Sequence, residues 1–338
     1  MKRKKVRIKD IAKRLGISPA TVSLALNNPN KVNRSTRKDI LTLCEQLNYT
    51  RPQKLKNRKK QIAVLIGYTY NFTNDFFSKI AESLLDLAKE HEYNLILESW
   101  PNEQDDIPWC LSHKNIDGVI VIGKILREKL LWIKQKGLPL VVCSHTLHDM
   151  ALHTVLPDGK SGSYQATKHL IELGHTKIAT ITGGDFYREV AMERIEGYRF
   201  ALIEAGIKVR EDYIALGDFA KYDHSDKPLK KLLALKNPPT AIVCASDSIA
   251  YNVIRTLNSQ GIKVPEEISI TGFDNTPPPL YAQAWLPKLT SVNVDTQELA
   301  KYSLKVLFDL MEENPKVSLR YTLPVKLHIG ETTGKPKD

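Results

Sequence analysis

Near the start of the chain, residues 8–27 read IKDIAKRLGISPATVSLALN. Apolar residues recur at helical spacing before Gly16 and again after Pro19, which predicts two short amphipathic helices. Gly16 can adopt the left-handed conformation that ends a helix at low cost. Ser18 is placed to cap the second helix, with Pro19 at the first helical position, where its missing N–H costs nothing. The stretch therefore predicts a helix-turn-helix, whose second helix enters the DNA major groove.

The distribution of charge favours DNA binding over two helices that merely pack together. Residues 1–60 hold 18 Lys and Arg against 3 Asp and Glu, whereas residues 61–338 hold 31 against 35. The whole chain carries a formal charge of +11. The excess of positive charge thus belongs to the small N-terminal segment, as binding to phosphates requires.

The composition sets limits on the class of protein. A chain of 338 residues with 42% hydrophobic content can form two or three compact units. No apolar stretch follows the basic residues 1–5, and no run of about 18 apolar residues occurs, so we expect neither a signal peptide nor a membrane span. Cys44 and Cys244 stand in apolar surroundings and are expected to be buried thiols of a cytoplasmic, nucleoid-associated protein. The four cysteines are far apart, and no metal or other cofactor is predicted.

A third helix is predicted from about Asn33 to Leu47, with Asn33 as its cap. The three helices make a DNA-binding domain of residues 1–50, which Tyr49 closes. Residues 51–60 (RPQKLKNRKK) form a basic hinge. This hinge is either a plain tether or a segment that becomes ordered on DNA.

From residue 61 the pattern changes to alternating strands and helices. Short apolar runs are typical of strands buried on both faces of a parallel sheet. Repeated β-α-β units of this kind give a doubly wound sheet, and their number favours two similar α/β lobes with a cleft between them. The predicted strands are residues 62–66, 94–98, 118–122, 140–143, 178–182, 240–245 and 268–272, with a helix over about 76–90.

Polar residues follow the ends of these strands, where ligands of such sheets bind. Carboxylates and amides pair with neighbouring hydroxyls, and aromatic rings cover apolar C–H faces, so the cleft suits a polyhydroxylated ligand such as a sugar. Asp247 can equally be a helix cap. The strand-end residues are Tyr68, Asn74, Ser99, Trp100, Ser144, His145, residues 183–185, Ser246, Asp247 and residues 273–275.

Several stretches, in order and spacing, resemble the lactose-repressor family of bacterial transcription regulators across essentially the whole chain. They are residues 9–12 (KDIA) with 21–23 (TVS), 36–37 (TR), 47–49 (LNY), 74–77 (NDFF), 116–120 (IDGVI), 169–175 (HLIELGH), 193–194 (ER) with 197–198 (GY), 239–242 (PTAI), and 264–269 (VPEEIS) before 272–274 (GFD).

The resemblance implies an all-α helix-turn-helix headpiece, a hinge, and an α/β effector domain of periplasmic-binding-protein type, residues 61–338, with two doubly wound lobes. The first lobe would hold about 61–160 and 293–322, and the second 161–292 and 323–335. Family members bind roughly palindromic double-stranded DNA operators as homodimers, sometimes as tetramers, and a small molecule changes their affinity for the operator.

The function implied is a ligand-responsive repressor of carbohydrate uptake or metabolism genes, with a purine or a sugar phosphate as alternative effectors. An α/β enzyme is the competing class. It is disfavoured because no Gly-rich nucleotide loop follows the first strand, where residues 66–71 read IGYTYN.

Carried over by position, Pro19 and Ala20 open the recognition helix where the family reads bases. Leu24 replaces an Arg that many members have, so it can make only apolar contacts, such as one with a thymine methyl. In the hinge, the position of the Leu that family members insert into the minor groove falls near Lys59, so Arg58 and Lys59 are expected in or beside that groove. Leu55 would take the role of the inserted Leu only if the register shifts. The positions that hold the DNA backbone are Ser18, Thr21, Ser23, Asn27, Lys31, Asn33, Thr36 and Tyr49.

In the effector domain, Phe76 corresponds to a ring that lines the family's pocket, and Asp274 to a carboxylate opposite the ligand. Arg194 corresponds to a guanidinium that fixes the ligand, although it could instead pair with a carboxylate at a helix end. Asp247 matches a frequent ligand contact, and Ser246 replaces an Asn. The remaining ligand-binding candidates are Tyr68, Asn74, Asp158 and Phe219.

Overall fold

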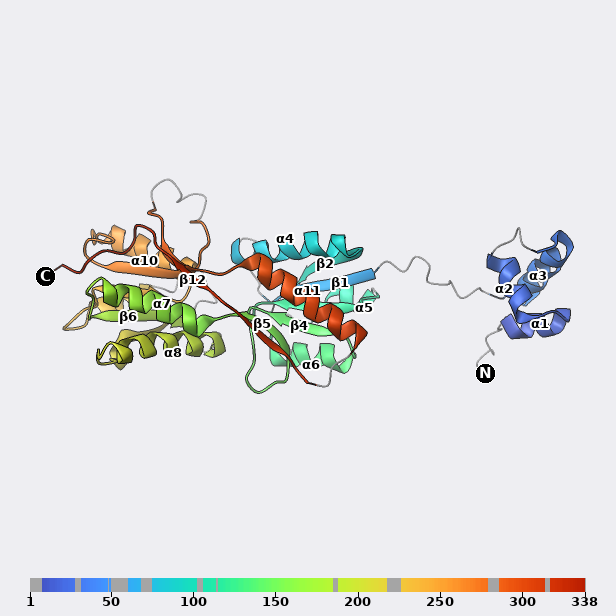
Figure 1. The fold of residues 1–338 in the computed structure, drawn as a ribbon, viewed down its shortest axis with the longest axis horizontal. Helices are drawn as coiled ribbons and strands as arrows, with labels where there is room; N and C mark the ends of the chain where they lie inside the picture. Colours follow the sequence, from blue (N-terminus) through green and yellow to red (C-terminus); the bar gives the residue numbers. More distant parts are fainter. Residues whose placement is uncertain are drawn as a thin grey trace. The chain divides into compact units, whose positions relative to one another are not determined.

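The structure, a computed structural model, describes residues 8–27, 32–47, 49, 60–67, 75–101, 106–113, 115–184, 188–217, 226–278, 286–313 and 317–337. The chain divides into two compact units, Met1–Lys59 and Lys60–Asp338 (Figure 1). Six predicted site residues lie outside the described residues, as does the side chain of Asn27. These six are Lys31, Arg58, Lys59, Tyr68, Asn74 and Phe219.

The N-terminal unit contains the predicted helices, α1 (Ile8–Leu15), α2 (Pro19–Asn27) and α3 (Arg34–Gln46). Gly16 has a φ of +62° and ends α1 in the left-handed conformation. The backbone N–H of Thr21 donates to Ser18 Oγ at 3.0 Å, and the N–H of Ser35 donates to Asn33 Oδ1 at 3.0 Å. Both predicted N-caps are therefore confirmed.

A small apolar core holds these three helices together. Ile11, Val22 and Ile40, one from each helix, have no exposed surface. Ala12, Ala25 and Cys44 complete the buried cluster. Burying a side chain of this size stabilises the folded state by about 1.5–3 kcal/mol. So short a domain depends on such contributions because it buries little surface in total.

The first sheet of the second unit has the strand order β11-β5-β4-β3-β1-β2, and all its neighbours run parallel. Ile62, Val64 and Ile66 pack into one apolar cluster, whereas Ala63 and Leu65 pack into another, so this sheet is buried on both faces. Its elements are β1 (Lys60–Ile66), α4 (Asp75–Glu90), β2 (Tyr93–Ser99), α5 (Trp109–His113), β3 (Gly118–Ile122), α6 (Arg127–Gln135), β4 (Leu140–Cys143), β5 (His153–Pro157), α11 (Thr296–Glu312) and β11 (Arg320–Leu323).

The second sheet has the order β12-β10-β9-β8-β6-β7 and is parallel except for β12, which runs antiparallel to β10. Its strand order repeats that of the first sheet, so the second unit has two doubly wound lobes, as predicted. Its elements are α7 (Gly159–Glu172), β6 (Ile178–Gly183), α8 (Arg188–Glu204), a 3₁₀ turn (Glu211–Tyr213), β7 (Ile214–Gly217), α9 (Asp226–Leu233), β8 (Ala241–Cys244), α10 (Asp247–Ser259), β9 (Ser269–Asp274), β10 (Thr290–Asn293) and β12 (Lys326–His328).

The chain crosses between the lobes after β5, after β10 and after β11 (Figure 1). At the first two crossings an Asp begins the next helix. Asp158 Oδ1 accepts from the N–H of Ser161 at 2.8 Å at the start of α7. Asp295 Oδ1 accepts from the N–H groups of Gln297 and Glu298 at 3.0 Å at the start of α11. These caps fix where each crossing segment ends.

Among the described residues, no helix is both long and apolar enough to span a membrane. All four cysteines are buried and outside disulfides, and burial was predicted for Cys44 and Cys244.

Candidate functional site

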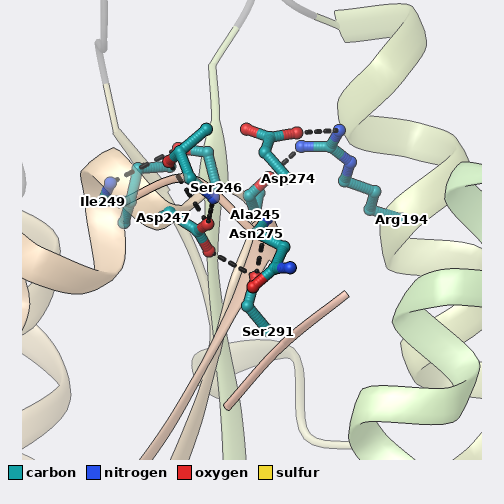
Figure 2. A network of polar contacts seen from close by, with 9 residues as sticks. Arg194, Ala245, Ser246, Asp247, Ile249, Asp274, Asn275 and Ser291 are labelled. Carbon is teal, nitrogen blue, oxygen red and sulfur yellow. Dashed lines mark hydrogen bonds and ion pairs between the residues drawn. The ribbon is translucent and has the colours of Figure 1, made fainter. Parts of the chain in front are cut away.

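Asp247, at the start of α10, is fully buried in the second lobe. Its Oδ1 accepts from the Ser291 hydroxyl at 2.5 Å, and its Oδ2 accepts from the Thr276 N–H at 2.6 Å and the Thr276 hydroxyl at 3.3 Å (Figure 2). Asp247 is not the helix cap. That role belongs to Ser246, whose Oγ accepts from the N–H of Ile249 at 3.3 Å. Asp247 therefore holds the segment after β9 in place through its hydrogen bonds from Thr276.

Burial and the charge of Asp274 raise the pKa of Asp247, while its bonds from Ser291 and Thr276 oppose the shift. A carboxylate can lie this deep in the lobe because its oxygens are satisfied by hydrogen bonds.

Arg194, on α8, reaches over the carboxyl ends of β8 and β9. Its Nη1 donates to the carbonyl of Ala245, and its guanidinium carbon lies 3.9 Å from the centre of the Phe273 ring. Its Nη2 lies 4.0 Å from Asp274 Oδ1 (Figure 2). Burial lowers the pKa of Arg194, against the charges of Asp274, Glu193 and Asp247. Arg194 Nε is buried and has no hydrogen-bond partner among the described residues.

Asp274 ends β9 in an unusual backbone conformation, with a φ of +106°, and Asn275 follows at +53°. Such conformations cost about 1–3 kcal/mol each and persist only where the surroundings impose them. Here the N–H of Asn275 donates to the Ser291 hydroxyl at 3.1 Å. Burial raises the pKa of Asp274, and the charge of Arg194 lowers it. The side chain of Asp274 is held toward Arg194 (Figure 2).

This pair offers hydrogen-bond donors and acceptors at the strand ends of the second lobe. The side chains of Arg194 and Asp274 keep 14% and 15% of their surface exposed, and the 4.0 Å between them is too long for a hydrogen bond. Each group therefore retains capacity to donate to or accept from a ligand. Among the described residues, no group of three His, Cys, Asp or Glu could hold a metal ion.

Two ion pairs connect α8 with the first lobe. Lys124, which follows β3, lies with Nζ 3.8 Å from Glu189 Oε2, and both side chains are largely buried. Arg320 on β11 donates to Glu193, next to Arg194 in the chain. The helix that carries Arg194 thus contacts both lobes.

Two other described candidates, Phe76 and Asp158, have structural roles. Phe76 is 5% exposed, belongs to an apolar cluster and contacts Phe77 edge-on, with 5.5 Å between ring centres. Asp158 caps α7. Sequence reasoning did not select Ser291 or Thr276, because these residues lie 44 and 29 positions from Asp247 and carry no motif.

In the N-terminal unit, the start of α2 is open to solvent. Ser18, Pro19 and Ala20 are exposed, and Leu24 keeps 38% of its surface. Asn33 is exposed as well. Four further predicted DNA contacts are half-buried: Thr21, Ser23, Thr36 and Tyr49. The accessible residues at the start of α2 are those that a helix-turn-helix presents to bases.

A helix-turn-helix unit, joined to a two-lobed α/β unit with polar side chains at its strand ends, defines a DNA-binding, ligand-responsive transcription regulator. Comparison with known proteins agrees. Residues 7–52 match the bacterial regulatory proteins of the lacI family, and residues 167–333 match a periplasmic binding protein-like domain.

Two relatives align over nearly the whole chain. The probable HTH-type transcriptional repressor ExuR of Bacillus subtilis is 31% identical over 317 residues, which is 91% of this chain and 92% of that protein. The HTH-type transcriptional repressor PurR of Vibrio cholerae is 30% identical over 312 residues, 90% of this chain and 91% of that protein. The chain therefore belongs to the LacI family of bacterial transcriptional regulators, and both of these relatives are repressors rather than enzymes.

Two solved structures share the fold. The transcriptional regulator CelR in complex with cellobiose superposes with a TM-score of 0.73 at 25% identity, covering 97% of this chain and 99% of that one. A LacI family regulator from Enterococcus faecium with bound ribose gives a TM-score of 0.69 at 26% identity, covering 82% of this chain and 100% of that one.

Proposed function

We propose that this regulator is a cytoplasmic repressor of carbohydrate uptake or metabolism genes, and that a sugar is its effector. The observation that carries this proposal is the placement of Arg194 beside Asp274, 4.0 Å apart and partly exposed at the strand ends of the second lobe. A guanidinium offers donors and a carboxylate offers acceptors, which together suit vicinal hydroxyls. The structures of CelR with cellobiose and of the Enterococcus faecium regulator with ribose support this class of ligand.

Within the site, Arg194 and Asp274 contact the effector directly in this proposal. Asp247 and Ser246 hold the ends of β8 and β9 in place around them. The remaining candidates, Phe76, Asp158, Tyr68, Asn74 and Phe219, are proposed on the family's pattern alone.

The chain is proposed to bind a roughly palindromic operator as a homodimer, with the start of α2 in the major groove. Pro19, Ala20 and Leu24 would contact bases. The exposed caps Ser18 and Asn33 would hold the backbone, as would Thr21, Ser23, Asn27, Lys31, Thr36 and Tyr49. In the hinge, Arg58 and Lys59 would lie in or beside the minor groove.

Thermal unfolding of the full chain against a panel of ligands tests the effector proposal. The panel holds neutral sugars, sugar phosphates and nucleobases. A ligand at 100 times its dissociation constant stabilises the fold by about 2.7 kcal/mol, which is visible as a shift in melting temperature. A neutral sugar should produce this shift. A response to a nucleobase or a sugar phosphate alone would replace the sugar proposal with that alternative.

A further inference from the structure

The first lobe contains a buried histidine, His145. His145 is 1% exposed, and neither of its ring nitrogens has a partner among the described residues. Burial and the positive charges of Lys124 and His148 lower its pKa to about 3, so the ring is neutral at physiological pH. A neutral imidazole has one donor nitrogen and one acceptor nitrogen. Among the described residues nothing bonds to either nitrogen, which is rare for a buried polar side chain.

The position of His145 is set by the register of the first sheet. Ile122 at the end of β3 pairs with Cys143 at the end of β4. Lys124 and His145 each follow two residues later, so both lie at the carboxyl edge of this sheet. Ser144 has a φ of +62°, a conformation that non-glycine residues rarely adopt. The chain thus makes a constrained turn at the residue just before His145.

The helix that carries Arg194 faces the same edge. Glu189 lies five residues before Arg194 on α8, and its Oε2 is 3.8 Å from Nζ of Lys124. Glu189 Oε2 and Arg194 Nε are also buried without a hydrogen bond among the described residues. Unused donors and acceptors therefore occur on both lobes, and the Lys124–Glu189 pair connects them.

We propose that His145 is the first lobe's contact with the effector, and that it binds neutral hydroxyl groups of the effector. This inference rests on the proposed sugar-responsive function. A hydroxyl both donates and accepts, so it matches the donor and acceptor nitrogens of a neutral imidazole and the acceptor oxygen of Glu189. A carboxylate or phosphate offers acceptors only. It would leave the acceptor nitrogen of the imidazole unmatched.

Titration calorimetry on the full chain tests this with neutral sugars and their anionic counterparts. The probes are D-ribose with ribose 5-phosphate, D-glucose with D-glucuronate, and cellobiose with cellobionate. His145→Phe removes both polar atoms, and His145→Gln restores one donor and one acceptor. His148→Gln is the matched control, because His148 is exposed on the same segment.

The expected result has four parts. A neutral sugar binds the wild-type chain more tightly than its anionic counterpart. His145→Phe weakens that binding about tenfold or more, as loss of two hydrogen bonds predicts. His145→Gln recovers part of the affinity, and His148→Gln leaves it unchanged.

Other results would overturn the inference. Equal sugar affinity of wild type and His145→Phe would show that His145 does not contact the effector. Tighter binding of the anionic probe would refute the proposal that the effector is a neutral sugar. If no sugar binds the wild type at all, the proposed sugar effector fails together with this inference. Should His145→Phe not fold, nitrogen-15 spectra of histidine-labelled wild type decide. The bound sugar must then shift both ring nitrogens of His145, and unchanged signals would refute the contact.

Discussion

A Cβ atom on Gly272 would lie 2.1 Å from Oδ1 of Asp247, so only glycine fits in β9 beside this carboxylate. The same atom would lie 2.6 Å from Cδ2 of Leu289. The buried carboxylate of Asp247 therefore requires glycine at position 272. Together the two residues fix the end of β9, where Asp274 faces Arg194.

Gly272→Ala should destabilise the effector domain by about 1–3 kcal/mol, because neither the carboxylate nor Leu289 can move without disturbing its contacts. Chemical denaturation of the two proteins measures the difference. Gly334→Ala is the matched control, since its new Cβ would meet Pro265 at an ordinary 3.6 Å. Equal stability of wild type and Gly272→Ala would show that Asp247 does not occupy this position.

Arg194→Ala should abolish the response to the effector before it unfolds the domain. Loss of a charged hydrogen-bond donor costs about 1.5–3 kcal/mol of binding, or roughly a 10–150-fold loss of affinity. Calorimetry with the sugar that stabilises the wild type measures this loss. Arg199→Ala is the control on the same helix, because Arg199 pairs with Glu211 at the surface. Unchanged affinity in Arg194→Ala would remove Arg194 from the binding site.

His145 should make the effector domain sensitive to acid. Its pKa is about 3 in the folded chain, against the ordinary value of 6.5. Between these values the unfolded chain binds the extra proton and the folded chain does not, so this contribution to stability is lost as the pH falls from about 6.5 toward about 3. The slope reaches about 1.4 kcal/mol per pH unit.

The comparison of wild type with His145→Gln isolates this effect, because burial also lowers the pKa of His153, His169 and His175 in both proteins. The difference in unfolding free energy between wild type and His145→Gln is measured at pH 7, 6 and 5. This difference should shrink or change sign as the pH falls. A constant difference would mean that His145 is not buried as a neutral ring.

Leu24→Arg should change the operator that the regulator prefers. Arg binds guanine O6 and N7 with two hydrogen bonds, whereas Leu offers only apolar contact. Selection from a random double-stranded library should yield guanine at a new position in each half-site. Leu41→Arg is the control, because Leu41 is similarly exposed, at 42% against 38%, but lies on α3. If both variants select the wild-type operator, Leu24 does not face the bases.

The sequence predicted most of the central strands because their apolar runs are unambiguous. The runs at residues 118–122 and 140–143 match β3 and β4 at both ends. β10 was missed because polar residues conceal its burial. In β10, Thr290 and Ser291 are at most 1% exposed, since their hydroxyls bond to other buried groups, including Asp247. The edge strands β7, β11 and β12 are short and partly exposed, so they carry little periodic signal.

The site could be predicted only in part, for a similar reason. Arg194 and Asp274 stood out through their resemblance to family positions, and the structure places them 4.0 Å apart. The partners of Asp247 are brought to it by pairing of strands and loops that are distant in the chain. His145 was visible only as a polar residue at a strand end. That no described residue bonds to its ring nitrogens is a property of the folded lobe.

The central claim is that this chain recognises a specific operator, and selection of DNA by the full-length protein tests it most directly. A random double-stranded library should yield a roughly palindromic site, and fluorescence anisotropy should then compare that site with a scrambled sequence at one salt concentration. Specific binders prefer their site by about 10³-fold or more, and we expect a ratio of that size. A ratio near one, with binding that depends only on salt, would contradict the claim.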